Sequence, residues 1–383
     1  MSTIDRRTWI KKSTLATAGI STLAFNGFGA IQPKSLLETE NPFDENVRRL
    51  LYNENHNGPS KEVRKTIKSL VGRSNRYATF HEYDHTELKR LIAHQEGVSP
   101  ENILLGHGSF EPLIWMATHF GSKGEEIVVP SPTFDVVGLF ARKLGASVVP
   151  VEVNNDFKMD LDAMESKVSS KTSLVTVCNP NNPTGTSVDP NVLKSFCKLV
   201  SKKCPVLIDE AYIHYLESWQ THTMAPLIAE GHNVLVTRTF SKIYGMAGLR
   251  IGFMMGPKKL IKELETKFTL GFPGNMPNSL SVGAAITALK DQEFIHQSRK
   301  YNEQAKEMFY ALLNELNLPY VKSHTNFVYF DVTKFKEYKS LMWSYKILLA
   351  GGWPTKPNWA RVTMGSMEDL DFLKEKMIGK KWL

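Results

Sequence analysis

The chain has 383 residues, of which 42% are hydrophobic and 22% are charged, with 25 glycines and 19 prolines. These proportions are typical of a globular protein of one large or two medium domains, and they exclude a disordered, fibrous or coiled-coil chain. Three cysteines are too few for a disulfide scaffold, and a net charge of +8 spread along the chain does not indicate a nucleic-acid-binding surface.

The first 30 residues combine a basic start with a weakly apolar run. Arg6 and Arg7 are followed closely by Trp9, and residues 13–30 include Ser, Thr, Asn and Gly, so the run is too polar for a stable membrane anchor. The segment resembles a twin-arginine signal peptide, which implies export by the twin-arginine translocase to the periplasm. The alternative is a disordered basic leader on a cytoplasmic protein. Removing the segment, which holds four basic residues and one acidic residue, would leave a net charge near +5.

Residues 31–60 are polar with little periodicity, and they predict an N-terminal arm that joins the smaller of two domains. From residue 61 to residue 272, short apolar runs alternate with helical patterns. This alternation predicts a large α/β domain of three layers, in which helices cover both faces of a mostly parallel seven-stranded sheet. The expected strands are Ile103–Leu105, Ile127–Val129, Ser147–Val151, Leu174–Cys178, Val206–Asp209, Val234–Thr239 and Arg250–Met255.

The pattern changes after Pro257. Long helical stretches are followed by two apolar runs, and residues 273–383 therefore predict a smaller α+β domain. The expected helices are Lys259–Leu270, Leu280–Leu289 and Phe294–Leu316, and the expected strands are Asn326–Asp331 and Arg361–Met364.

Ligands of α/β sheets bind beyond the carboxyl ends of the strands, so the segments that follow the strands are candidates for a site. Gly106-His107-Gly108-Ser109 follows the first strand and opens a helix, as an anion-binding loop or an ordinary glycine turn would. A second segment, residues 179–185, contains two Asn-Pro steps, which make a stiff turn able to fix an asparagine amide.

Charged residues follow two later strands. Asp209-Glu210-Ala211-Tyr212 places a nearly buried carboxylate at a strand end, where it needs either a protein cation or the protonated nitrogen of a ligand. Ser241-Lys242 follows the next strand, and Arg250 comes eight residues after the lysine.

Together these segments resemble the pyridoxal-phosphate-dependent aminotransferases of fold type I, and within them the histidinol-phosphate aminotransferase branch. The resemblance extends from about Leu50 to the last strand and helix. The order of Asn-Pro-x-Asn-Pro-Thr-Gly, Asp-Glu-Ala-Tyr and Ser-Lys with a later arginine is highly specific in combination. It implies a ping-pong transfer of an amino group from an amino acid or amine to a 2-oxo acid.

The resemblance also implies roles for individual residues. Lys242 would bind the aldehyde of pyridoxal phosphate and then move a proton, Asp209 would keep the ring nitrogen protonated, and Tyr212 and Asn182 would contact the ring oxygen. Phe134 would stack on the ring. The phosphate would be held by Ser109, Phe110, Thr239, Ser241 and Arg250.

Three further residues are implied, two on the substrate side and one that binds the cofactor across the subunit interface. Arg361 would bind the α-carboxylate of the substrate through two parallel hydrogen bonds, and Asn55 in the arm would lie near the substrate. Tyr77 would reach the phosphate of the neighbouring subunit, which makes a homodimer part of the site.

The chain departs from the family pattern in ways that bear on the substrate. Phe110 replaces an aspartate in the glycine loop, and His56 replaces a proline after Asn55. Close relatives have an arginine near residues 347–354 that helps to bind the substrate phosphate, whereas this chain has Ala350, Gly352 and Trp353 there. We therefore expect an apolar or aromatic donor in place of histidinol phosphate.

Alternative functions stay open at this point. A decarboxylase, lyase or racemase could use the same lysine and cofactor. The sequence His81-Glu82-x-x-His85 matches a zinc metallopeptidase signature, although no third ligand is evident. A non-catalytic envelope protein is the third alternative, and the presence of every expected catalytic residue argues against it.

Overall fold

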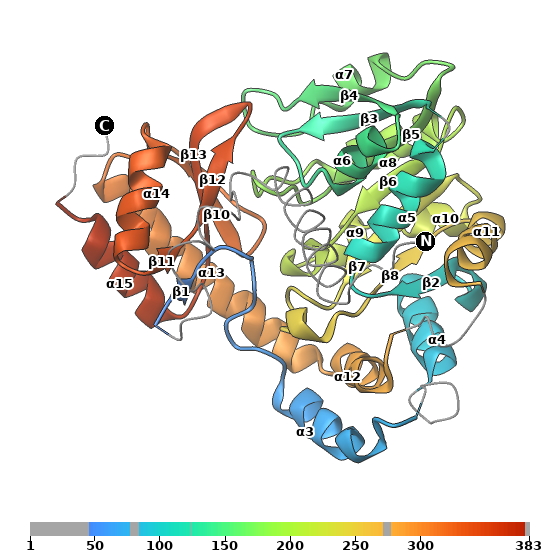
Figure 1. Ribbon diagram of the computed structural model, residues 1–383, viewed down its shortest axis with the longest axis horizontal. Helices are drawn as coiled ribbons and strands as arrows, with labels where there is room; N and C mark the ends of the chain where they lie inside the picture. Colours follow the sequence, from blue (N-terminus) through green and yellow to red (C-terminus); the bar gives the residue numbers. More distant parts are fainter. Residues whose placement is uncertain (1–45, 77–83, 123, 271–276, 380–383) are drawn as a thin grey trace, which may run out of the picture.

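A computed structural model describes residues 46–76, 84–122, 124–270 and 277–379. Two bodies lie side by side, a large one built on a seven-stranded sheet and a small one built on a four-stranded sheet (Figure 1). The twin-arginine segment and Tyr77 lie outside the described residues. Within the described residues, no helix is both long enough and apolar enough to span a bilayer.

The sheet of the large body confirms the predicted α/β fold. Strand β8 runs antiparallel to both of its neighbours, and the other strands run in one direction. The strands, in their order across the sheet, are β2 (Ile103–Gly106), β8 (Gly252–Met255), β7 (Val234–Thr239), β6 (Val206–Asp209), β5 (Thr172–Cys178), β3 (Glu126–Ser131) and β4 (Ser147–Glu152).

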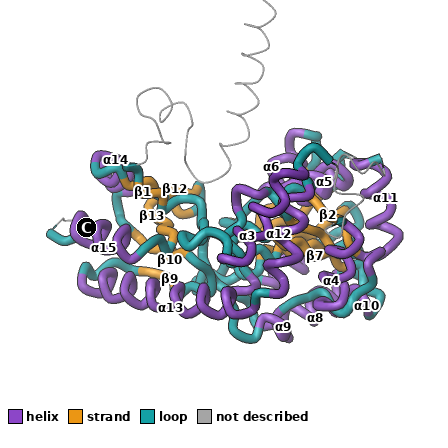
Figure 2. The backbone as a smooth tube through the Cα atoms, turned by 90° about the horizontal axis from the view of Figure 1, so that it is seen from below, coloured by secondary structure: helices purple, strands orange, loops and turns teal. Residues whose placement is uncertain are grey.

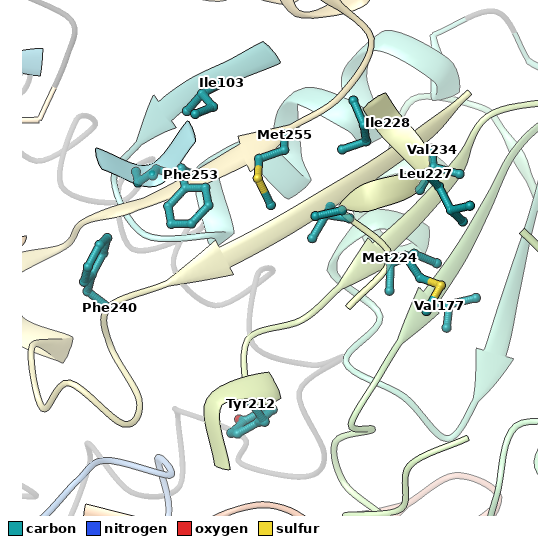
Figure 3. Close-up of a cluster of buried hydrophobic side chains, with 14 of the residues drawn as sticks. Ile103, Val177, Tyr212, Met224, Leu227, Ile228, Val234, Phe240, Phe253 and Met255 are labelled. Carbon is teal, nitrogen blue, oxygen red and sulfur yellow. The ribbon is translucent and has the colours of Figure 1, made fainter. Parts of the chain in front are cut away.

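Alternate side chains of each strand enter different cores, because successive residues of a strand point to opposite faces. Leu207 lies in one core cluster, whereas its neighbours Val206 and Ile208 lie in the other. Figure 3 shows part of the second cluster, with Val234, Phe253 and Met255 on the sheet and Tyr212 on a short turn at its border. Both faces are therefore buried, which explains the nearly continuous apolar runs of the sequence.

Helices cover both faces. One face packs against α5 (Phe110–Gly121), α6 (Val136–Lys143) and α11 (Lys258–Thr269). The other packs against α4 (His85–Glu96), α7 (Leu161–Ser166), α8 (Pro190–Val200), α10 (Pro226–Ala229) and α12 (Ser279–Lys290), with α3 (Lys61–Leu70) on α12 and α9 (Trp219–His222) nearby. The predicted boundary at residue 272 precedes α12, whose buried side chains belong to the core of the large body.

The small body is an antiparallel sheet with helices on one face. Its strands, in their order across the sheet, are β12 (Ala350–Trp353), β13 (Lys356–Thr363), β10 (Phe327–Asp331) and β9 (Tyr320–Val321). Val328, Phe330 and Val362 pack against α13 (Gln292–Glu315), α14 (Phe335–Ser344) and α15 (Met367–Met377). Helix α13 extends from this body toward the large one (Figure 2).

The arm joins the small body before it enters the large one. Strand β1 (Arg48–Arg49) pairs in parallel with β11 (Ile347–Leu348), and Leu50 is buried in the core of the small body. The chain then crosses between the two bodies and begins α3, whose N-terminus is capped by the Ser60 hydroxyl. Tyr52 and Asn53 in the crossing segment contact Lys242 and Tyr212, so the arm passes the carboxyl ends of β7 and β6.

Candidate active site

The carboxyl ends of β2, β5, β6 and β7 meet at one edge of the large sheet, next to the start of the reversed strand β8. This edge holds Asp209 at the end of β6, Thr239 at the end of β7 and Gly106 at the end of β2. The pairs Gly106↔Gly252 and Thr239↔Gly252 bring the first loop and the lysine loop to the same place. The loops that the sequence singles out are therefore neighbours in space.

Lys242 lies at the centre of this edge. Its Nζ donates to the carbonyl of Tyr52 at 2.9 Å and lies 5.5 Å from the ring centre of Tyr212. Burial lowers the pKa of Lys242 to about 7, helped by the positive charges of Arg361 and Arg250 and opposed by nearby carboxylates. The amine is therefore about half neutral near pH 7, as a nucleophile and proton carrier requires.

Asp209 is a buried carboxylate that is suited to a cationic ligand. Its Oδ1 accepts a hydrogen bond from Thr237 Oγ1 at 3.0 Å, and burial raises the pKa of Asp209 to about 6. A protonated ring nitrogen placed against this carboxylate would offset the cost of burying its charge.

The residue after Asp209 belongs to a buried ion network that holds the loop in place. Glu210 Oε2 accepts from Arg238 Nε at 3.0 Å and Nη2 at 2.8 Å, and Arg238 Nη1 donates to Glu96 at 2.8 Å. The three side chains are about 1% exposed. The network fixes the backbone that presents Asp209 and Tyr212.

Hydroxyl and guanidinium groups gather near the end of β7 and the start of α5. Thr239 Oγ1 donates to Ser241 Oγ at 2.8 Å, and Arg250 Nη1 lies 3.4 Å from the same oxygen. Ser109 is the residue before α5, where backbone N–H groups and the helix dipole favour an anion.

A glycine permits this arrangement. Gly108 has a φ of +76°, and a Cβ there would lie 2.6 Å from Arg250 Nη2, so a side chain would displace the guanidinium. The donor set and the open backbone fit a phosphate group.

Two other predicted residues border this region. Phe134 lines a small cavity together with Asp209 and Cys178, a position that suits a ring-stacking side chain. The side chain of Phe110 packs edge-on against Phe140 at 6.3 Å between ring centres.

Arg361 enters the site from the small body. It is 8% exposed, its Nη1 donates to Asn182 Oδ1, and its Nη2 donates to the carbonyl of Leu51 at 2.6 Å. Its Nε has no hydrogen-bond partner among the described residues, and burial lowers the pKa of Arg361 to about 10. A substrate carboxylate would supply the missing acceptor.

The surroundings of Arg361 are aromatic. Its guanidinium carbon lies 5.1 Å from the ring centre of Phe327 and 5.9 Å from that of Trp353. Tyr329 lies 5.2 Å from Trp353 and 4.7 Å from Trp359 between ring centres. The face of the small sheet that presents the arginine is thus a mainly apolar surface.

The arm supplies a residue that the sequence analysis does not single out. Asn53 Nδ2 donates to Tyr212 Oη at 2.9 Å. Asn55, predicted near the substrate, donates to the carbonyl of Ile243 at 2.8 Å and to Ser298 Oγ at 3.2 Å. Its contact with substrate stays a prediction. Both asparagines stand in one short motif, and only the fold shows which one faces the phenol.

The zinc alternative gains no support from the described residues. Helix α4 begins at His85, after the capping residue Asp84, and His85 Nε2 lies 2.8 Å from the carbonyl of Pro277. His81 and Glu82 lie outside the described residues. In the described ranges, no three His, Cys, Asp or Glu side chains gather in a way that could hold a metal ion.

Comparisons with known proteins agree with this geometry. The family model "Aminotransferase class I and II" matches residues 46–376. The chain is 34% identical over 333 residues to a histidinol-phosphate aminotransferase of Caldicellulosiruptor saccharolyticus, covering 86% of this chain and 91% of that one. A protein of the same name from Moorella thermoacetica is also 34% identical, with 84% and 82% covered.

Solved structures show the same fold. The histidinol-phosphate aminotransferase of Sinorhizobium meliloti, solved in complex with pyridoxal-5'-phosphate, superposes with a TM-score of 0.76. It is 24% identical, and the match covers 86% of this chain and 89% of that one.

Proposed function

The chain belongs to the class I and II aminotransferase family, and from that premise we propose that it takes its amino group from an amino acid with an apolar or aromatic side chain. The protein is a pyridoxal-phosphate-dependent aminotransferase, and a 2-oxo acid is its acceptor. The observation that carries the donor assignment is the aromatic face around Arg361.

The residues at the sheet edge provide the kinds of groups that pyridoxal phosphate needs: a buried carboxylate, a phenol, hydroxyls and a guanidinium. When bound, pyridoxal phosphate supplies an aldehyde and a ring that accepts electrons. Asp209 would hold the ring nitrogen in its protonated form, and Tyr212 would donate to the ring oxygen. The phosphate would be bound by Ser109, Thr239, Ser241 and Arg250.

Lys242 is placed to move the proton of the reaction. Its pKa of about 7 lets the amine take a proton from the substrate Cα and return it at neutral pH. The charge of Arg361 contributes to that low pKa. A carboxylate bound to Arg361 would reduce this contribution and strengthen the lysine as a base once substrate is present.

Strand register explains why aromatic groups surround the carboxylate-binding arginine. Residue pairs directly opposite in an antiparallel sheet share a face. Arg361 pairs with Tyr329 on one side and with Ala350 on the other. Trp359 is two residues from Arg361 on the same strand, and a register shift between Gly351 and Trp353 turns Trp353 toward the arginine. The substrate side chain would therefore meet rings and a methyl group.

The names of the relatives favour a different donor. Histidinol phosphate carries a phosphate dianion, which needs at least one further cation to replace its hydration. Ala350 and Gly352 provide none, and the nearby Lys356 has its Nζ over the ring of Phe157 at 5.2 Å. These contacts support an uncharged donor side chain.

Assembly and export complete the proposal. We propose a homodimer in which Tyr77 reaches the phosphate of the partner subunit, on the family resemblance alone. We also propose export by the twin-arginine route to the periplasm, supported by the Arg6-Arg7 motif. Sedimentation of the purified protein and the location of a tagged full-length chain test the two statements.

An amino-donor screen on the purified holoenzyme tests the donor class. Each candidate donor is mixed alone with the holoenzyme, and the loss of the visible absorbance of the bound cofactor measures the donor half-reaction. We expect kcat/KM for phenylalanine, tyrosine, tryptophan or leucine to exceed that for histidinol phosphate by at least about tenfold. If histidinol phosphate is the best donor, the donor assignment is wrong while the family's reaction stands.

A matched variant sharpens the screen. Trp353→Leu should lower kcat/KM for the aromatic donors by about 10- to 100-fold and leave alanine nearly unchanged, because alanine does not reach the rings. If no amino acid converts the cofactor to its amine form, a decarboxylase, lyase or racemase reaction is the better assignment.

A further inference from the structure

Asn53 lies where the arm, the small body and the large body meet. Its side chain is 1% exposed and its backbone has a φ of +55°. Asn326 Nδ2 from the end of the small sheet donates to the carbonyl of Asn53 at 3.1 Å. Residues other than glycine rarely adopt this left-handed conformation, and asparagine is among those that tolerate it best. The position is therefore strongly constrained by its neighbours.

Two hydrogen bonds with Thr363 orient the side-chain amide. The backbone N–H of Asn53 donates to Thr363 Oγ1 at 2.9 Å, and Thr363 Oγ1 donates its hydrogen to Asn53 Oδ1 at 3.1 Å. With Oδ1 used as an acceptor, Nδ2 faces Tyr212 and donates to its Oη at 2.9 Å. The chain of donors runs from strand β13 through the arm to the phenol.

The direction of these hydrogen bonds determines whether the phenol of Tyr212 can donate its own hydrogen. A phenol oxygen that accepts from Asn53 keeps its own hydrogen for another acceptor. Burial raises the pKa of Tyr212 above its usual value, and the charge of Arg361 and the hydrogen bond from Asn53 oppose that rise. A phenol that accepts a hydrogen bond is a stronger donor.

We propose that Asn53 is a positioning residue for the reaction: it keeps the hydroxyl hydrogen of Tyr212 available to the cofactor and ties that hydroxyl to β13, the strand that carries Arg361. The inference rests on the proposed function. Asn53 would act through Tyr212, because its Oδ1 accepts from Thr363 and its Nδ2 donates to the phenol.

The test is a pH titration of the visible absorbance of the bound cofactor in the holoenzyme. Asn53→Gly removes the amide and keeps the backbone N–H and the left-handed conformation, so it isolates the side chain. Without the Asn53 donor, Tyr212 binds the cofactor's ring oxygen more weakly. We expect the midpoint of the titration to rise by about 0.5 to 1 pH unit.

Further variants separate positioning from general damage. Thr363→Val, which frees the amide to turn, should raise the midpoint by a smaller amount. Asn57→Ala changes an exposed residue of the same segment and should leave the midpoint unchanged. Asn53→Asp reverses the bond with Tyr212 and should raise the midpoint at least as much as Asn53→Gly. It serves in place of the glycine variant if that variant does not fold.

Two results would overturn the inference. If Asn53→Gly and Asn53→Asp titrate like the wild type while Tyr212→Phe shifts the midpoint, Asn53 does not position the phenol, although the proposed function stands. If the wild type binds no chromophore, the proposed function fails and the inference fails with it.

Discussion

The two halves of the active site are built in different ways. The cofactor half lies at one edge of a parallel sheet, where each loop after a strand contributes one or two polar groups. The substrate half lies on one face of an antiparallel sheet, where Arg361 is surrounded by side chains from three strands and contacts the backbone carbonyl of Leu51 in the arm. In the first half, short loops determine the chemistry. In the second, the register between strands determines it.

Because the two halves are built from different sheets, residues of one half can be substituted without affecting the other half. In the proposed site, the loops at the strand ends would hold the cofactor, which is the same for every substrate. We propose that the face of the small sheet contacts the substrate, so single substitutions at Ala350 or Trp353 should alter donor specificity and leave Lys242 and Asp209 in place. If the two halves are separable, a substitution in one half should leave the chemistry of the other unchanged.

The largest effect is expected at the lysine, which serves both halves. Lys242→Ala should lower kcat on the order of 10⁵-fold, because it removes the group that binds the cofactor covalently and moves the proton. Steady-state kinetics and reduction with borohydride followed by mass analysis measure the loss. Lys262→Ala, an exposed lysine of α11, is the matched control, and residual activity near the wild type in Lys242→Ala would contradict the mechanism.

The cofactor half is tested by Asp209→Asn. The variant loses the charge opposite the ring nitrogen, and kcat should fall by about 10³-fold.

The folded apoprotein of Asp209→Asn should also be more stable than the wild type at neutral pH. The pKa of Asp209 is about 6 in the folded protein, which is higher than in the unfolded chain. Ionised Asp209 therefore destabilises the fold above about pH 6, and this loss of stability disappears as the pH falls toward about 4.

Thermal unfolding of the apoprotein at pH 5 and pH 8 checks the second effect. The melting temperature of the wild type should be lower than that of Asp209→Asn at pH 8, and the difference should be smaller at pH 5. If the difference in melting temperature instead grows as the pH falls, the fold stabilises the ionised carboxyl and the prediction is wrong.

The substrate half is tested by Arg361→Ala. Loss of the bidentate carboxylate contact should lower kcat/KM by about 10²- to 10³-fold, while the affinity for pyridoxal phosphate changes little. Cofactor titration by absorbance and donor kinetics separate the two quantities. Loss of cofactor binding equal to the loss of kcat/KM would show that the halves are not separable.

The smallest expected effect is that of the positive charge of Arg361, in the substrate half, on the pKa of Lys242, in the cofactor half. The rate constant for capture of the cofactor by the apoprotein should rise tenfold per pH unit below about pH 7 and level off above it, since only the neutral amine of Lys242 reacts. In Arg361→Ala the midpoint should move upward, because one positive charge near the amine is gone. Stopped-flow absorbance between pH 5 and 9 measures both curves.

The large sheet could be predicted from the sequence because its strands are buried on both faces and form continuous apolar runs. Each predicted strand lies within two residues of an observed one. Arg250 was expected to begin the last strand, whereas it has a φ of +50° in the turn before β8. From this turn, the guanidinium of Arg250 donates to the carbonyl of His107 in the anion loop at 3.3 Å.

The small body and the arm were harder to predict, because their contacts join residues far apart in the chain. The pairing of Arg361 with Tyr329 and Ala350 depends on register, which apolar patterns alone do not determine. The choice between Asn53 and Asn55 depends on a left-handed residue that turns one amide toward Tyr212. Local motifs identified the arm as part of the site, and only tertiary structure identified the residue.

Helix α13 has a mechanical consequence. It is 24 residues long, which corresponds to about 36 Å. Ile295 near its start is buried in the core of the large body, and Phe309 and Leu313 near its end are buried in the core of the small one. A continuous helix anchored at both ends is a stiff connection between the two cores, and it limits how far Arg361 can move relative to Lys242.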